Sequence, residues 1–207
     1  MENRGILTVV SGFAGSGKGT LMKELIRNYD CYAMSVSATS RAPRPGEEEG
    51  VSYFYKTREE FERMIEKGEL LEYAEYVGNY YGTPRSFVDE KLSEGKDVIL
   101  EIEIQGAMQI KKQYPEALLL FITPPSAAEL KERLLRRGTE TEDVIRKRMQ
   151  RAAEEAEGID QYDYIVVNDD VAECTELLHG IIRAAHFTPR HQAEFVEKIR
   201  EELQGNR

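Results

Sequence analysis

The sequence is poor in the residues from which disulfide frameworks, metal centres and histidine-based catalytic sites are built. Its 207 residues include no tryptophan, three histidines and two cysteines, Cys31 and Cys174, which are far apart and form no CxxC motif. These counts predict neither a disulfide scaffold nor a zinc site. His179, His186 and His191 have no carboxylate partner or ligand spacing in the sequence, so we expect them to be surface residues.

Long hydrophobic runs are also missing. No apolar stretch approaches the roughly twenty residues that a membrane-spanning helix needs, and the first five residues carry no signal-like apolar region. The formal net charge of −10 disfavours a nucleic-acid or anionic-membrane surface, which requires a broad basic face. We therefore expect a cytoplasmic protein without nucleic-acid or membrane partners, in which local arginine clusters bind any anionic small substrate.

The sequence does contain a glycine-rich loop near its start. An apolar run at residues 6–10 precedes the loop, and apolar residues at helical spacing follow it. Glycines let successive backbone N–H groups turn toward phosphate oxygens, and the following helix adds its N-terminal donors and dipole. The expected phosphate-binding residues are Gly12, Phe13, Ala14, Gly15, Ser16, Gly17, Lys18, Gly19 and Thr20.

This loop fits the P-loop pattern except at its last position. Gly12 and the Gly17-Lys18 pair match, but Gly19 stands where Ser or Thr is usual, and Thr20 follows. The departure leaves open whether a hydroxyl contacts a bound metal directly, Thr20 does so, or the metal keeps a water there. A glycine-rich turn with a solvated lysine is the alternative, and the flanking strand and helix argue against it.

Further segments typical of buried strands alternate with helical patterns at residues 31–36, 97–103, 117–122 and 164–169. In open α/β sheets ligands bind at the carboxyl ends of the strands, where Glu101 and Glu103 fall. Between the first two of these segments, Arg41 and Arg44 lie in a proline-containing loop, a usual location for binding groups.

A small α+β unit is expected after this loop. Thr57 and Glu60 form a capping-box pattern ahead of a helix, and Gly78-Asn79 is expected to turn residues 70–77 into a hairpin. Pro84 is then expected in the first turn of the next helix.

Two charged helices joined by a polar turn indicate a mobile lid. Ser126 and Glu129 form a second capping box, and we expect Leu130, Leu134 and Leu135 to face inward. We expect a solvated surface for the following cations: Arg136, Arg146, Lys147 and Arg151.

The chain resembles the guanylate kinase family over about residues 5–185. The resemblance rests on six separate stretches in the family's order: residues 12–20, 35–37 with 41–46, 78–83, 101–106, 137–142 and 164–169. It implies an α/β fold of the P-loop nucleoside monophosphate kinase type, in which a five-stranded parallel sheet is flanked by helices and carries an inserted α+β GMP-binding subdomain and a helical lid. The implied single domain has its core at 1–36, 84–136 and 158–207, the GMP-binding insertion at 37–83 and the lid at 137–157.

The resemblance also implies roles for individual residues. It assigns the GMP phosphate to Arg41, Arg44, Tyr53 and Tyr81, and the guanine base to Ser37, Glu72, Thr83 and Glu103. It assigns the transferring phosphoryl group to Arg137 and Arg148, with Lys18 and Arg41 as further catalytic cations, and the adenine of ATP to Asn168. Glu103 departs from the family, where aspartate is usual. Mg²⁺ is expected to arrive with ATP, without a metal site made by the protein alone.

Two rival functions are considered. A guanylate-kinase-like binding module without catalysis need not keep Lys18, Arg137 and Arg148, which this chain has. An enzyme for another purine monophosphate or a sugar phosphate remains open because of Glu103. The expected reaction is transfer of the γ-phosphoryl group of ATP to GMP, with dGMP as a second acceptor. The sequence leaves open whether the tail after about residue 185 packs on the core or on a second subunit, as in a homo-oligomer.

Overall fold

Strand β1 (Leu7–Gly12) is the central element of the fold. The structure is a computed structural model that describes residues 4–76, 78–136 and 141–205. Over these residues one parallel sheet has the order β2-β7-β1-β8-β9, and Val9 of β1 pairs with Leu100 and Leu119. The other strands are β2 (Tyr32–Met34), β7 (Asp97–Glu101), β8 (Leu118–Thr123) and β9 (Tyr164–Val167). The predicted five-stranded parallel sheet is therefore confirmed.

Alternation along the strands supplies the sheet with two apolar faces. Val9 packs in one core cluster and Val10 in the other because successive side chains of a strand point to opposite faces. Helices α1 (Lys18–Asn28) and α7 (Val171–Ala185) cover the face of Val10. The face of Val9 is covered by α3 (Arg85–Ser93), α4 (Ile104–Gln113), α5 (Ala127–Arg136) and α6 (Glu142–Ala156).

The prediction that Leu130, Leu134 and Leu135 all face inward is wrong for one of them. Leu130 and Leu134 of α5 are buried, but Leu135 is 48% exposed. Residues four apart share a helix face, whereas the next residue is rotated by about 100°. Leu135 therefore lies beside the buried stripe and faces away from the sheet.

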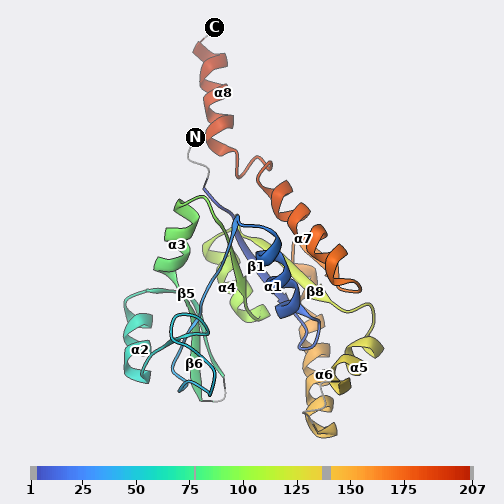
Figure 1. Cartoon of the computed structure of the whole chain (residues 1–207). Helices are drawn as coiled ribbons and strands as arrows, with labels where there is room; N and C mark the ends of the chain where they lie inside the picture. Colours follow the sequence, from blue (N-terminus) through green and yellow to red (C-terminus); the bar gives the residue numbers. More distant parts are fainter. Residues whose placement is uncertain (1–3, 77, 137–140, 206–207) are drawn as a thin grey trace.

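A second, four-stranded sheet forms a separate lobe beside α3 and α4 (Figure 1). The strand order of this sheet is β4-β3-β6-β5. Its strands are β3 (Ala38–Thr39), β4 (Phe54–Tyr55), β5 (Leu70–Tyr76) and β6 (Asn79–Pro84), and helix α2 (Arg58–Glu66) lies between β4 and β5 in the chain. The predicted capping box of Thr57 and Glu60 is confirmed, and so is the antiparallel pairing of β5 with β6. Pro84 was predicted in the first turn of a helix, but it is the last residue of β6 and the residue before α3. Its missing N–H therefore removes no helical hydrogen bond.

The C-terminal tail continues as α8 (Ala193–Gly205), which follows a break after α7 and projects from the body of the molecule (Figure 1). None of the described residues of α8 is buried, but the segment before it contacts the core, because Arg190 Nη1 donates to the Pro115 carbonyl oxygen at 3.4 Å. The short helix η1 (Ile159–Gln161) leads into β9. No described helix is both long and apolar enough to cross a membrane.

Two of the three histidines, His179 and His186, correct the prediction of surface residues without partners. His186 Nε2 lies 2.9 Å from an oxygen of the buried Asp97, which also accepts a hydrogen bond from Ile6 N at 2.8 Å. His179 Nδ1 lies 2.7 Å from the Tyr32 hydroxyl. The partners are distant in sequence, and only the packing of α7 against the sheet brings them together.

Candidate functional site

The glycine-rich loop joins the carboxyl end of β1 to α1, as predicted. Gly12, Gly15 and Gly17 have φ angles of 152°, 96° and 91°, a region that side chains rarely adopt. A Cβ on Gly12 would meet the Ile122 carbonyl oxygen at 2.1 Å, and one on Gly17 would meet Asn168 Nδ2 at 2.3 Å. The loop can approach β8 and Asn168 this closely only because glycine stands at these positions.

Gly12→Ala is expected to destabilise the protein by about 2–4 kcal/mol, because the side chain would be strained and would press on the backbone of β8. Gly19→Ala is the matched control, since a Cβ there would meet nothing within 4 Å and the residue lies in α1. Alanine favours a helix over glycine, so the control should keep or slightly gain stability. Urea unfolding compares the two variants, and equal midpoints would contradict the strain at Gly12.

Two side chains hold the loop in place through hydrogen bonds to its backbone carbonyl oxygens. Lys18 Nζ donates to the carbonyl oxygens of Gly12 at 2.6 Å and Phe13 at 3.2 Å. Asn168 is buried after β9, and its Nδ2 donates to the Ser16 carbonyl oxygen at 2.8 Å. Asn168 thus has a role in positioning the loop, which the sequence did not predict, and its contact with adenine stays a prediction.

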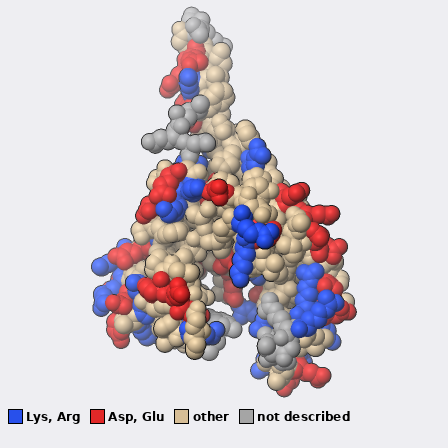
Figure 2. Space-filling view, viewed as in Figure 1, with Lys and Arg blue, Asp and Glu red and all other residues tan. Residues whose placement is uncertain are grey.

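A cavity of about 630 Å³ lies beside this loop. Its lining includes Lys18 from the loop, Glu103 from the β7–α4 connection and Arg148 from α6. A neighbouring groove is lined by Gly19, Thr20 and the loop, with Glu101 opposite. In Figure 2 the surface is hollowed between the lobe that carries α2 and β6 and the part that carries α5 and α6. The tertiary structure therefore brings the loop, the strand ends and three cations of the predicted lid, Lys147, Arg148 and Arg151, to a common cavity.

Helix α6 contributes to the lining of this cavity a residue, Arg151, that was predicted to be solvated. Arg151 Nη2 contacts Glu103 Oε2 at 2.5 Å, and its Nε donates to Glu155 Oε1 at 3.1 Å. Arg151 therefore links α6 to the residue at the start of α4. The solvated prediction is confirmed for Arg146, whose exposed side chain pairs with the exposed Asp143 at 2.9 Å. Arg137 lies outside the described residues, as do residues 139 and 140 of the predicted mobile turn, whereas Thr141 precedes α6 and Glu142 and Asp143 lie in its first turn.

A buried carboxylate lies in the hairpin of the second sheet. Glu72 is 6% exposed, and its Oε1 accepts a hydrogen bond from Thr83 Oγ1 at 2.7 Å. Burial raises the pKa of Glu72, and the hydrogen bonds from Thr83 oppose that shift. Gly106 of α4 makes room for this side chain, because a Cβ there would lie 2.9 Å from Glu72 Oε2. The resemblance assigns Glu72 and Thr83 to the guanine base, and that contact stays a prediction. The sequence did not predict that Gly106 makes room for the Glu72 side chain.

An arginine and two tyrosines form a cluster in the same lobe. The Arg41 guanidinium carbon lies 5.4 Å from the centre of the Tyr53 ring, and the rings of Tyr53 and Tyr81 are 6.0 Å apart. Burial raises the pKa of Tyr53, so its phenol remains a proton donor at neutral pH. Arg44 is exposed in the same loop, and Ser37 is half-buried beside β3. The cluster presents cations and hydroxyl donors, the groups that bind a phosphate.

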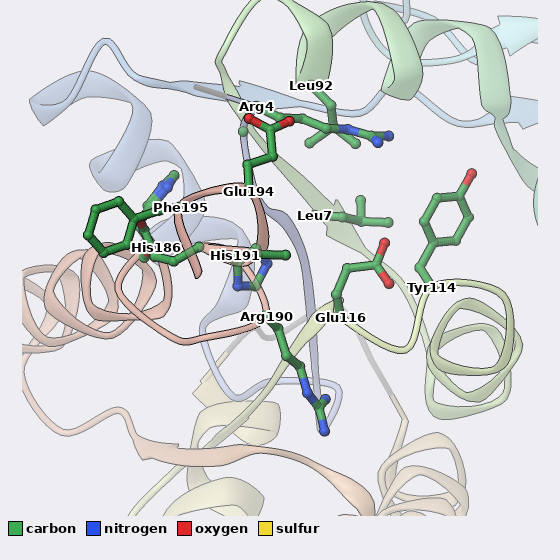
Figure 3. A pocket seen from close by; sticks show the side chains of 13 residues that line it. Arg4, Leu7, Leu92, Tyr114, Glu116, His186, Arg190, His191, Glu194 and Phe195 are labelled. Atoms are coloured by element: carbon green, nitrogen blue, oxygen red, sulfur yellow. The ribbon is translucent and has the colours of Figure 1, made fainter. Parts of the chain in front are cut away.

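Another cavity, of about 390 Å³, lies at the opposite end of the sheet. Its lining includes Leu7 and Leu92 from the core, with His186, Arg190 and Phe195 from the tail (Figure 3). None of the described residues predicted for the functional site lines it. The chemistry suggested by the sequence therefore gathers at the carboxyl ends of the strands.

The comparisons with known proteins agree on one family. The family model described as guanylate kinase matches residues 4–185. A guanylate kinase of Halalkalibacterium halodurans is 54% identical over 185 residues, which cover 89% of this chain and 91% of that protein. One of Bacillus cereus is 51% identical over 203 residues, 98% of this chain and 99% of the relative. The crystal structure of guanylate kinase from Anaplasma phagocytophilum superposes with a TM-score of 0.72 at 34% identity, covering 90% of this chain and 89% of that one.

Proposed function

The chain belongs to the guanylate kinase family of nucleoside monophosphate kinases, and we propose that it transfers the γ-phosphoryl group of ATP to GMP, giving ADP and GDP. In this proposal the glycine-rich loop binds ATP, and the lobe formed by residues 37–83 binds GMP. Residues 137–157 act as the lid, and the remaining residues form the core. dGMP is proposed as a second acceptor.

The observation that carries the choice of acceptor is the buried Glu72 held by Thr83. Guanine presents N1–H and an exocyclic amino group as neighbouring donors, which one carboxylate can accept as a pair. Adenine has an acceptor where guanine has N1–H, so the same carboxylate would face a lone pair. An unpaired buried group costs about 1–3 kcal/mol or more, which is enough to discriminate between the bases. A sugar phosphate would leave Glu72 without a base to bind.

The acceptor phosphate needs no general base. Its second pKa is about 6, so it is largely ionised at neutral pH and ready to attack. Catalysis is then alignment and charge stabilisation around a loose transition state. We assign Lys18 and Arg148 to the transferring group, together with Arg137. Arg41, Arg44, Tyr53 and Tyr81 bind the GMP phosphate, and Ser37 and Glu103 complete the guanine site.

The groove beside the loop fits a magnesium ion bound with ATP. Mg²⁺ usually takes one or two protein ligands and completes its shell with water and phosphate oxygens. The hydroxyl of Thr20 and the carboxylate of Glu101 line this groove, and the described residues contain no cluster of three or more metal-ligating side chains. When bound, the ion would neutralise charge on the ATP phosphates, and Thr20 and Glu101 would hold it. We place the reaction in the cytoplasm, where we expect ATP and GMP.

An acceptor panel tests the proposal. The purified protein is supplied with ATP and Mg²⁺ and, in parallel, with GMP, dGMP, AMP, CMP, UMP or ribose phosphates, and ADP formation is followed in a coupled assay. Turnover confined to GMP and dGMP is expected because only guanine satisfies Glu72. Absence of turnover with GMP would favour another acceptor or a binding module.

A further inference from the structure

The carboxylate of Glu47 binds three parts of the acceptor lobe at once. Its Oε1 contacts Arg41 Nη2 at 2.9 Å, and its Oε2 accepts hydrogen bonds from the Arg44 backbone N–H and the Tyr55 hydroxyl, each at 2.8 Å. The side chains of Glu47 and Arg41 are only 22% and 14% exposed. One carboxylate therefore ties both arginine positions of the loop to strand β4.

The pairing persists at every pH at which an enzyme of this kind would work. The Arg41 guanidinium, the Arg44 backbone N–H and the Tyr55 hydroxyl lower the pKa of Glu47 to about 2. Burial and the adjacent Glu47 raise the pKa of Tyr55, so this hydroxyl stays protonated and continues to donate. Tyr53 and Tyr81 are the other titratable groups near Arg41, and Arg44 is the other charged one.

The contacts of Arg41 leave donors for a ligand. Nη2 binds Glu47, Nη1 donates to the Ala42 carbonyl oxygen at 2.8 Å, and Tyr53 lies against the guanidinium. A further hydrogen bond joins the side chain to Tyr81, and Nε is buried without a hydrogen-bond partner among the described residues. A guanidinium has five N–H donors, more than these contacts use. The side chain is thus held in one orientation while part of its donor set remains open.

We propose that Glu47 is a positioning residue of the acceptor-phosphate site, which holds Arg41 and the Arg44 backbone in the arrangement that receives the phosphate of GMP. This inference rests on the proposed binding of GMP to this lobe. Two effects of Glu47 oppose each other, since its negative charge repels a phosphate while its contacts order a long, flexible arginine side chain. Ordering outweighs repulsion because Arg41 already neutralises Glu47, so the loop keeps the positive charge of Arg44, and because misplaced binding groups lose much of their effect.

The test replaces Glu47 by glutamine and measures KM and kcat with GMP and with ATP varied in turn. Glu47→Gln should raise the KM for GMP about tenfold, leave the KM for ATP unchanged and keep the thermal midpoint near that of the parent. Glu47→Asp, which keeps the charge, should recover part of the affinity for GMP. Glu48→Gln removes a neighbouring exposed charge and should behave as the parent.

Each other result overturns the inference. A lower KM for GMP would mean that Glu47 competes with the phosphate, and an unchanged KM would mean that it does not position Arg41. Equal losses for ATP and GMP with a lower thermal midpoint would assign it a purely structural role. Inactivity of the parent protein with GMP would instead refute the proposed function, so the two failures are distinguishable.

Discussion

Replacing Lys18 with alanine is expected to lower kcat for phosphoryl transfer by about 10²–10³-fold. The lysine lies at the start of α1 and lines the cavity that also contains Glu103 and Arg148. Charge develops on the transferring phosphoryl group in the transition state, and in the proposed assignment Lys18 would supply a cation there that water cannot replace. The stabilisation is larger in the transition state than in the bound substrate, so kcat should fall more than KM rises.

The matched control is Lys131→Ala, which removes an exposed lysine from α5. Steady-state rates with ATP and GMP and thermal midpoints are measured for both variants. Lys18 also holds the loop through the carbonyl oxygens of Gly12 and Phe13, so a small loss of stability is expected for Lys18→Ala. A rate within threefold of the control would contradict the assignment of Lys18 to the transferring group.

Glu72→Gln is expected to have opposite effects on activity and stability. Glutamine cannot accept both guanine donors, so kcat/KM for GMP should fall about 10²-fold while the KM for ATP is unchanged. Activity with AMP should rise somewhat, because the negative charge facing its N1 is gone. The free protein, in contrast, no longer has to hold an ionised carboxylate away from water, so the variant should be more stable than the parent at neutral pH.

The stability gain should depend on pH in a defined direction. The pKa of Glu72 is raised in the folded protein, so the folded state binds its proton more tightly than the unfolded state does. The stability this proton contributes to the parent is fully present below the unfolded pKa of about 4.3 and is lost as pH rises through the folded pKa. Thermal midpoints measured from pH 4 to pH 8 should show the variant's advantage appearing as pH rises.

The matched control for Glu72→Gln is Glu75→Gln, which changes an exposed carboxylate on the same strand. It should alter neither the KM for GMP nor the pH dependence of stability. A Glu72→Gln variant with the parent's activity on GMP would refute the guanine contact. One with a lower midpoint than the parent at pH 8 would refute the cost of burying the carboxylate.

The sequence alone determined the parts of the protein that depend on residues close together in the chain. The glycine-rich loop, the capping box at Thr57, the hairpin turn at Gly78 and the apolar run at residues 6–10 are local patterns whose physical meaning does not depend on distant residues. The family was identified from six sequence stretches in the expected order, and the five-stranded parallel sheet was predicted because that resemblance implies it. Errors occurred at boundaries, as at Pro84, and on helix faces, as at Leu135.

Only the tertiary structure decided which distant side chains meet. Glu72 is buried beside Gly106, His186 reaches Asp97, and Arg151 links α6 to Glu103. No periodicity predicts these contacts, because they depend on how helices and strands pack. Packing then decides how far each group is buried and which partners it contacts, which is why the raised pKa of Glu72 and the three contacts of Glu47 follow from the folded chain and not from its sequence.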